Sequence, residues 1–150
     1  MSDFRTIRPA RVEDAAALSG LLDELGYPAT VDVVTDRLAQ LARAGETVLV
    51  VDRDGELLGF VSVHVTPVLH RPTPVGRMTA LMITQRMQGH GLGRELVAAA
   101  ERFLAHAGCA LVEVTSNQKR VGAHAFYQHL GYTMTSHRFY RELTAEEWSA

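Results

Sequence analysis

The chain has 150 residues, of which 47% are hydrophobic and 21% are charged, and its formal net charge at pH 7 is -2. This length fits one domain with a single core, the composition excludes a disordered chain, and the near-neutral charge argues against a general nucleic-acid-binding protein. No apolar run approaches the length of a membrane-spanning helix. The N-terminal residues lack the apolar core of a signal peptide, so we expect a cytoplasmic protein.

Strand and helix signals alternate along the first half of the chain. They predict a strand over 4–8, helices over 11–25 and 31–44, and strands over 47–52 and 57–66. Thr30 is a typical N-cap for the second helix. The turn sequence Arg53-Asp54-Gly55 stands between the last two strands and indicates a hairpin.

The second half begins with a proline-rich loop over 67–76. It continues with a strand over 77–84, a helix over 95–107, a strand over 109–115, a helix over 120–130 and a strand over 132–142. A strand, a helix and a strand in succession imply a parallel pair with a right-handed crossover. The sequence therefore predicts a single α/β domain over 1–150. Its central mixed sheet would have about six to seven strands and helices on both faces.

A glycine-rich turn, Gln88-Gly89-His90-Gly91-Leu92-Gly93-Arg94, separates the strand over 77–84 from the following helix. Glycines let a ligand approach the backbone, and the free N–H groups of a helix N-terminus bind phosphate. Arg86 and Arg94 add positive charge. The turn is neither a Walker A loop, which needs a lysine before Ser or Thr, nor a dinucleotide loop, which needs a third glycine at Arg94. A tight turn without a ligand is the alternative.

Two motifs in this half resemble the GCN5-related N-acetyltransferase (GNAT) superfamily. The first is Gln88-x-x-Gly91-x-Gly93. The second is the segment 116–132, with Ala123, Phe126-Tyr127 and Leu130-Gly131-Tyr132 in the order and spacing of the same family's cofactor site. One helix and one strand lie between the two motifs, as in the family. The resemblance covers roughly residues 4–143.

The resemblance implies an acetyl-CoA-dependent N-acetyltransferase that acts on a primary amine by direct transfer in a ternary complex. In the family, backbone amides of the glycine turn hold the pyrophosphate and the preceding strand contacts the pantetheine. Carried over by position, the cofactor-binding residues are Leu81, Met82, Ile83, Gln88, Gly89, His90, Gly91, Leu92, Gly93, Arg94, Asn117 and Tyr127.

The resemblance also implies that Tyr127 is the general acid that protonates the sulfur of the departing thiol. By periodicity alone, Tyr127 is a core residue of its helix. Some relatives place a glutamate base on the strand before the glycine turn, where this chain has Arg77 and Thr79. The remaining candidate catalytic bases are Glu113 and His64, and a structural role is the alternative for His64. Cys109 lies in an apolar run, which favours packing over nucleophilic catalysis.

The acceptor is expected to be a small-molecule or peptide amine, with no nucleic acid or membrane as partner. Glu24, Asp32 and Asp36 either attract a cationic amine or form solvated helix faces. The seven histidines show no ligand spacing, so we expect no metal site. A homodimer could form through the strand over 132–142. Two other functions stay open: a non-catalytic acyl-CoA sensor and an ATP-binding module.

Overall fold

The computed structural model describes residues 4–115 and 121–149. The chain divides into two compact units, Met1–Val114 and Thr115–Ala150. The first unit contains a sheet and its helices, and the second contains helices only among its described residues. No helix within these described ranges has the length and apolar character needed to span a bilayer.

The first unit is built on a sheet with the strand order β1-β2-β3-β4-β5. The strands are β1 (Thr6–Pro9), β2 (Glu46–Arg53), β3 (Glu56–Thr66), β4 (Val75–Ile83) and β5 (Leu111–Val114). Neighbouring strands from β1 to β4 are antiparallel, whereas β4 and β5 are parallel. The predicted mixed sheet is therefore confirmed, although the described residues form five strands rather than six to seven.

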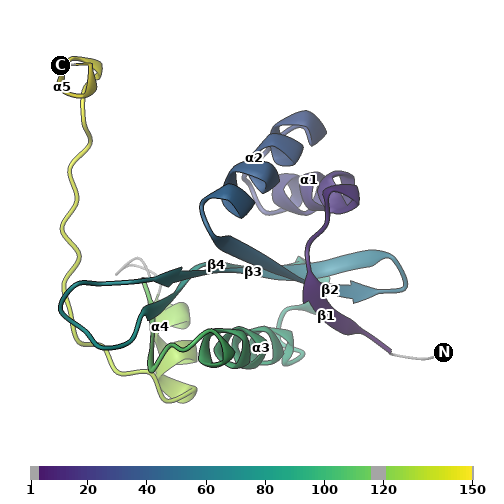
Figure 1. The fold of residues 1–150 in the computed structure, drawn as a ribbon. Coiled ribbons are helices and arrows are strands. Elements are labelled where there is room, and N and C mark those ends of the chain that lie inside the picture. The colour runs from purple at the N-terminus through teal and green to yellow at the C-terminus, as the bar shows by residue number, and fades with distance from the viewer. Residues whose placement is uncertain (1–3, 116–120, 150) are drawn as a thin grey trace. The chain divides into compact units, whose positions relative to one another are not determined.

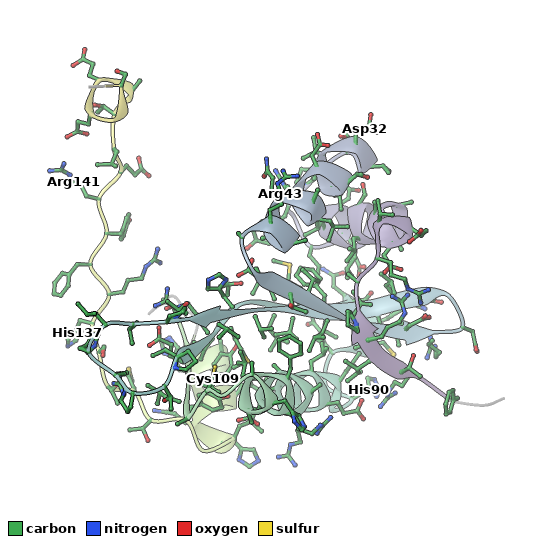
Figure 2. All side chains as sticks on the ribbon, in the orientation of Figure 1. Asp32, Arg43, His90, Cys109, His137 and Arg141 are labelled. Atoms are coloured by element: carbon green, nitrogen blue, oxygen red, sulfur yellow. The ribbon has the colours of Figure 1, made fainter. Side chains whose placement is uncertain are left out.

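Helices cover both faces of this sheet, as predicted. They are α1 (Ala15–Glu24), α2 (Val31–Arg43) and α3 (Leu92–His106). Figure 1 shows α1 and α2 on one face and α3 on the other. The Thr30 side chain caps α2 by accepting a hydrogen bond from the backbone N–H of Val33 (3.3 Å). Figure 2 shows Asp32 near the start of α2 and Arg43 near its end, where their charges complement the helix dipole.

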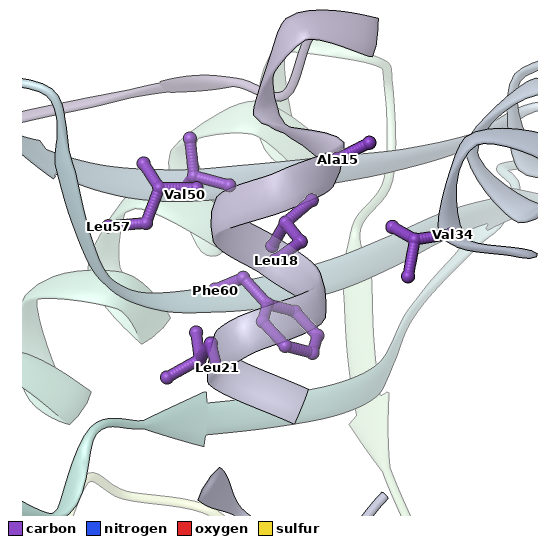
Figure 3. Packing of buried hydrophobic residues seen from close by; sticks show 7 residues of the cluster. All are labelled: Ala15, Leu18, Leu21, Val34, Val50, Leu57 and Phe60. Atoms are coloured by element: carbon purple, nitrogen blue, oxygen red, sulfur yellow. The ribbon is translucent and has the colours of Figure 1, made fainter. Parts of the chain in front are cut away.

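Buried apolar side chains join each helix layer to the sheet. On one face, Figure 3 shows the side chains of Ala15, Leu18, Leu21, Val34, Val50, Leu57 and Phe60 packed together. On the other face, α3 buries Leu92, Leu96, Val97, Ala100 and Leu104. A Cβ atom at Gly76 of β4 would lie only 2.9 Å from a methyl group of Leu104. The missing side chain therefore lets α3 lie close to β4.

The helix predicted over 11–25 begins instead with a 3-10 turn, η1 (Val12–Asp14), which leads into α1. The Asp14 carboxylate accepts hydrogen bonds from the Arg11 backbone N–H (2.7 Å) and the Arg8 guanidinium (2.8 and 2.9 Å). The bonds from Arg8 hold the pKa of Asp14 below its usual value, against the opposing effect of burial. A charged Asp14 therefore fixes the entry into α1.

The second unit contains α4 (Val121–His129) and the short α5 (Ala145–Trp148), which the sequence did not predict. The predicted strand over 132–142 is wrong, because this stretch has no regular secondary structure. A strand needs a hydrogen-bonded neighbour, and the described residues of this unit contain no other strand. The large apolar residues exposed here are Met134, Phe139, Tyr140 and Leu143.

Candidate functional site

The parallel pairing of β4 and β5 stops halfway along β4. The last residue pair is Met78 with Val114, and β4 continues through residues 79–83. Among the described residues, no strand pairs with this part of β4 on the β5 side. Backbone groups on an unpaired edge are available to an extended ligand. Leu81, Met82 and Ile83, predicted to contact the pantetheine, lie in this stretch and are half-buried.

The glycine turn follows directly after β4. A single 3-10 turn, η2 (Gln85–Met87), leads into it. Gly89 and Gly91 have φ angles of 82° and 80°, in the left-handed region that favours glycine. Gly91 is the N-cap of α3, and no side chain caps this helix. Its first N–H groups are therefore directed toward the turn without a side-chain partner, as an anion-binding helix terminus requires.

The side chains of the turn differ in what they contact. Gln88 donates a hydrogen bond from Nε2 to the carbonyl oxygen of Ile83 (3.2 Å), which ties the turn to the end of β4. His90 and Arg94 are exposed, whereas Leu92 is buried against the sheet layer. Arg86, expected to add positive charge, forms an ion pair with Glu56.

A carboxylate from α1 holds the junction between β4 and the turn. Glu24 accepts hydrogen bonds from the Thr84 hydroxyl (2.8 and 2.9 Å) and from the Gln85 backbone N–H (2.9 Å). The bond from Gln85, then that from Thr84, lowers the pKa of Glu24. Glu24 is therefore engaged within the fold. This contact could not be predicted from the sequence, because the partners of Glu24 lie 60 and 61 residues away along the chain.

A row of polar side chains crosses the sheet on the face that α1 and α2 share. Directly opposite residues on paired strands point to the same face, and the register joins Glu46 to His64, His64 to Arg77, and Arg77 to Glu113. Glu46 alternates along β2 with Val48, which packs against the α1 and α2 core. Both predicted bases, His64 and Glu113, therefore belong to one row.

The two predicted bases have different surroundings. The Glu113 carboxylate accepts two hydrogen bonds from the Arg77 guanidinium, at 2.8 and 2.5 Å, so its charge is already paired. His64 is half-buried beside Glu46. The Thr79 hydroxyl donates a hydrogen bond to the Glu46 carboxylate (2.9 Å). Sequence reasoning missed Glu46, since nothing in its local sequence marks it.

Tyr127 lies on α4 in the second unit. Its ring makes edge contacts with the rings of Phe126 (5.1 Å between centroids) and Tyr132 (5.7 Å). Tyr127 is half-buried, which suits a residue that packs its ring and keeps a polar end. Asn117, predicted to bind the cofactor, lies outside the described residues.

Cys109 and the potential metal ligands add no further chemistry to this site. Cys109 follows α3 (Figure 2), and burial raises the pKa of its thiol, which disfavours the nucleophilic thiolate. Within residues 4–115 and 121–149, no group of three or more His, Cys, Asp or Glu side chains could hold a metal ion.

The chain is similar to known acetyltransferases over most of its length. The model of the Acetyltransferase (GNAT) family matches residues 16–132. The chain is 33% identical over 146 residues to an aminoglycoside N(6')-acetyltransferase type 1 from Stenotrophomonas maltophilia, covering 94% of each chain. It is 36% identical over 91 residues to an aminoalkylphosphonate N-acetyltransferase from Salmonella typhimurium, covering 61% of this chain and 59% of that relative.

The fold has a solved counterpart. An aminoglycoside N-acetyltransferase determined in complex with CoA superposes with a TM-score of 0.81. The two chains are 18% identical, and the match covers 95% of this chain and 97% of the other. At this identity the likeness concerns the fold.

Proposed function

The chain belongs to the acetyltransferase (GNAT) family, and on this premise we propose that it transfers an acetyl group from acetyl-CoA to a primary amine. The observation that carries the proposal is the continuous path from the unpaired edge of β4 to the uncapped N-terminus of α3. The edge of β4 offers backbone groups to the extended pantetheine arm of CoA. The α3 N-terminus offers N–H groups to the pyrophosphate of CoA.

The proposed cofactor contacts follow this path in order. The backbone of Leu81, Met82 and Ile83 would pair with the pantetheine, and the amides from Gly89 to Arg94 would hold the pyrophosphate. Gln88 would keep the turn closed through its bond to Ile83. The same backbone edge would polarise the thioester carbonyl as negative charge develops on its oxygen.

The proposed reaction is a direct transfer without an acyl-enzyme. The amine lone pair forms the N–C bond, the C–S bond breaks, and its electron pair goes to sulfur. Tyr127 would supply the proton to the sulfur and regain one from solvent. Of the two candidate bases, the pairing of Glu113 with Arg77 favours His64 as the group that takes a proton from the amine.

The remaining parts of the proposal concern the acceptor and the assembly. The names of the relatives, an aminoglycoside and an aminoalkylphosphonate N-acetyltransferase, support a small primary amine as acceptor. The family match spans from α1 to Tyr132, which supports a single acetyltransferase domain over both units. The exposed apolar residues of segment 132–143 support a homodimer. We place the protein in the cytoplasm, where acetyl-CoA is available.

An amine panel tests the proposed function. Free CoA released from acetyl-CoA is measured with small amines, amino acids, aminoglycosides and peptides, beside thermal shifts with acetyl-CoA, CoA, ATP and NAD. We expect stabilisation by acetyl-CoA and CoA, together with amine-dependent release of CoA. Stabilisation by CoA without any turnover would favour an acyl-CoA sensor. Stabilisation by ATP alone would overturn the proposal.

Removing the Glu24 carboxylate is expected to weaken cofactor binding. Glu24→Ala frees Thr84 and the Gln85 N–H, so the start of the turn loses its anchor, and the Kd for acetyl-CoA should rise about fivefold. Because the folded-state pKa of Glu24 is lowered, its contribution is complete above the usual carboxyl pKa and is lost as the pH falls through the lowered value. Calorimetric titration measures the effect. Asp23→Ala, one residue away, is the control, and equal Kd values for both variants would contradict the role.

A further inference from the structure

The Glu46 carboxylate differs from the other acid of the polar row in what it binds. Its Oε1 accepts a hydrogen bond from the uncharged Thr79 hydroxyl (2.9 Å), and Glu46 is half-buried. Glu113, in contrast, is neutralised by Arg77. Across the described part of the chain, no cationic side chain forms an ion pair with Glu46. Glu46 therefore places a carboxylate without a cationic partner on the sheet face that α1 and α2 share.

Thr79 holds the Glu46 carboxylate beside the residue at which the edge of β4 becomes unpaired. In the register with β3, Ser62 pairs with Ala80 and Val63 pairs with Met78, so Thr79 is the extra residue of a bulge. Met78 is also the last residue of β4 that pairs with β5. Thr79 is therefore the first residue of the unpaired edge. Its hydroxyl holds a carboxylate that originates two strands away, on β2.

We propose that Glu46 binds the ammonium group of the acceptor and so selects primary amines that are protonated at neutral pH. This inference rests on the proposed function. An alkyl amine with a pKa of about 10 reaches the enzyme as an ammonium ion. A carboxylate binds such an ion through a strong charge-assisted hydrogen bond. Thr79 is a positioning residue, because it acts only through Glu46.

Glu46 and His64 have different roles in the proposed reaction: Glu46 binds the ammonium ion, and His64 accepts its proton. The ammonium ion binds Glu46 and gives one proton to the imidazole of His64, which lies opposite Glu46 in the register. An imidazole, with an ordinary pKa of about 6.5, accepts this proton more readily than a carboxylate does. The freed lone pair then forms the N–C bond, while His64 passes its proton to water. As the C–S bond breaks, the nitrogen loses its second proton to His64, and Tyr127 protonates the sulfur.

Acceptor kinetics of three variants test the proposal. Glu46→Gln is expected to raise the KM for an alkyl amine about tenfold, with the KM for acetyl-CoA changed less than about twofold. Thr79→Val should raise the amine KM in the same direction by a smaller factor. The control is Glu13→Gln, an exposed acid on η1, which should leave both values unchanged. The melting temperature with and without acetyl-CoA shows that each variant is folded.

An uncharged nucleophile separates ammonium binding from a general structural effect. An alkoxyamine is neutral at pH 7, so Glu46→Gln should change its KM by less than about twofold. If Glu46→Gln raised the KM for the alkyl amine and for the alkoxyamine equally, the proposal would be overturned. The same holds if Glu46→Gln and Glu13→Gln had equal KM values for the alkyl amine. If the wild-type protein acetylates no amine at all, the proposed function fails, and the role of Glu46 fails with it.

Discussion

Replacing Gly91 with valine is expected to raise the Kd for acetyl-CoA about a hundredfold. Gly91 has a φ angle of 80°, and a left-handed conformation costs an L-residue about 1–2 kcal/mol, with a higher cost for a β-branched side chain. No heavy atom lies within 4 Å of a Cβ built on Gly91. The added side chain would therefore occupy the space in front of the α3 N-terminus, where the pyrophosphate is proposed to bind.

Gly108 provides a matched control for the backbone strain. It follows the other end of α3, its φ angle is 94°, and a Cβ there also meets no heavy atom within 4 Å. Gly91→Val and Gly108→Val should lower the melting temperature by similar amounts, while only Gly91→Val weakens acetyl-CoA binding in a calorimetric titration. Similar Kd values for the two variants would show that the turn does not hold the cofactor.

The features of this fold that the sequence predicts are those encoded by neighbouring residues. The cap of α2 by Thr30 and the hairpin turn at Asp54 and Gly55 each depend on a few adjacent side chains and on local φ angles. The glycine turn is predicted for the same reason. The helix after the turn, predicted over 95–107, begins at Leu92, because Gly91 in its left-handed conformation serves as the N-cap.

Contacts between distant residues could not be predicted in this way. Glu24 meets Thr84, and Glu46 meets Thr79, through side chains that come together only when the sheet and its helices are assembled. The sequence suggested that the strand before the turn carries no carboxylate, since Arg77 and Thr79 occupy its positions. The structure brings a carboxylate to Thr79 from β2, through the hydrogen bond between the Thr79 hydroxyl and Glu46.

The prediction of a strand over 132–142 is wrong for a related reason. Alternation of apolar and polar residues indicates that a segment can pair, but it does not supply the neighbouring strand. The described part of the second unit has no such strand, and the apolar side chains of Met134, Phe139 and Tyr140 in this segment are exposed. A homodimer that pairs this segment with another copy would bury them. Light scattering coupled to size exclusion measures the oligomeric state directly.

Replacing Tyr127 with phenylalanine is expected to lower kcat about tenfold or more while the Kd for acetyl-CoA stays within about twofold. A phenol, with an ordinary pKa of about 10, can protonate a departing thiolate, and phenylalanine cannot. Phenylalanine keeps the aromatic ring that makes edge contacts with Phe126 and Tyr132. Stopped assays of CoA release and calorimetric titration measure the two quantities separately.

Tyr132→Phe is the matched control for this prediction, because Tyr132 packs against the same ring and belongs to the same unit. If proton donation by Tyr127 limits turnover, only Tyr127→Phe lowers kcat, and a thioester with a more acidic leaving thiol restores part of the rate, since such a thiolate departs without a proton. A kcat equal to that of the wild type would remove Tyr127 from the chemistry. Equal losses in both variants would instead assign the tyrosine pair to packing of α4.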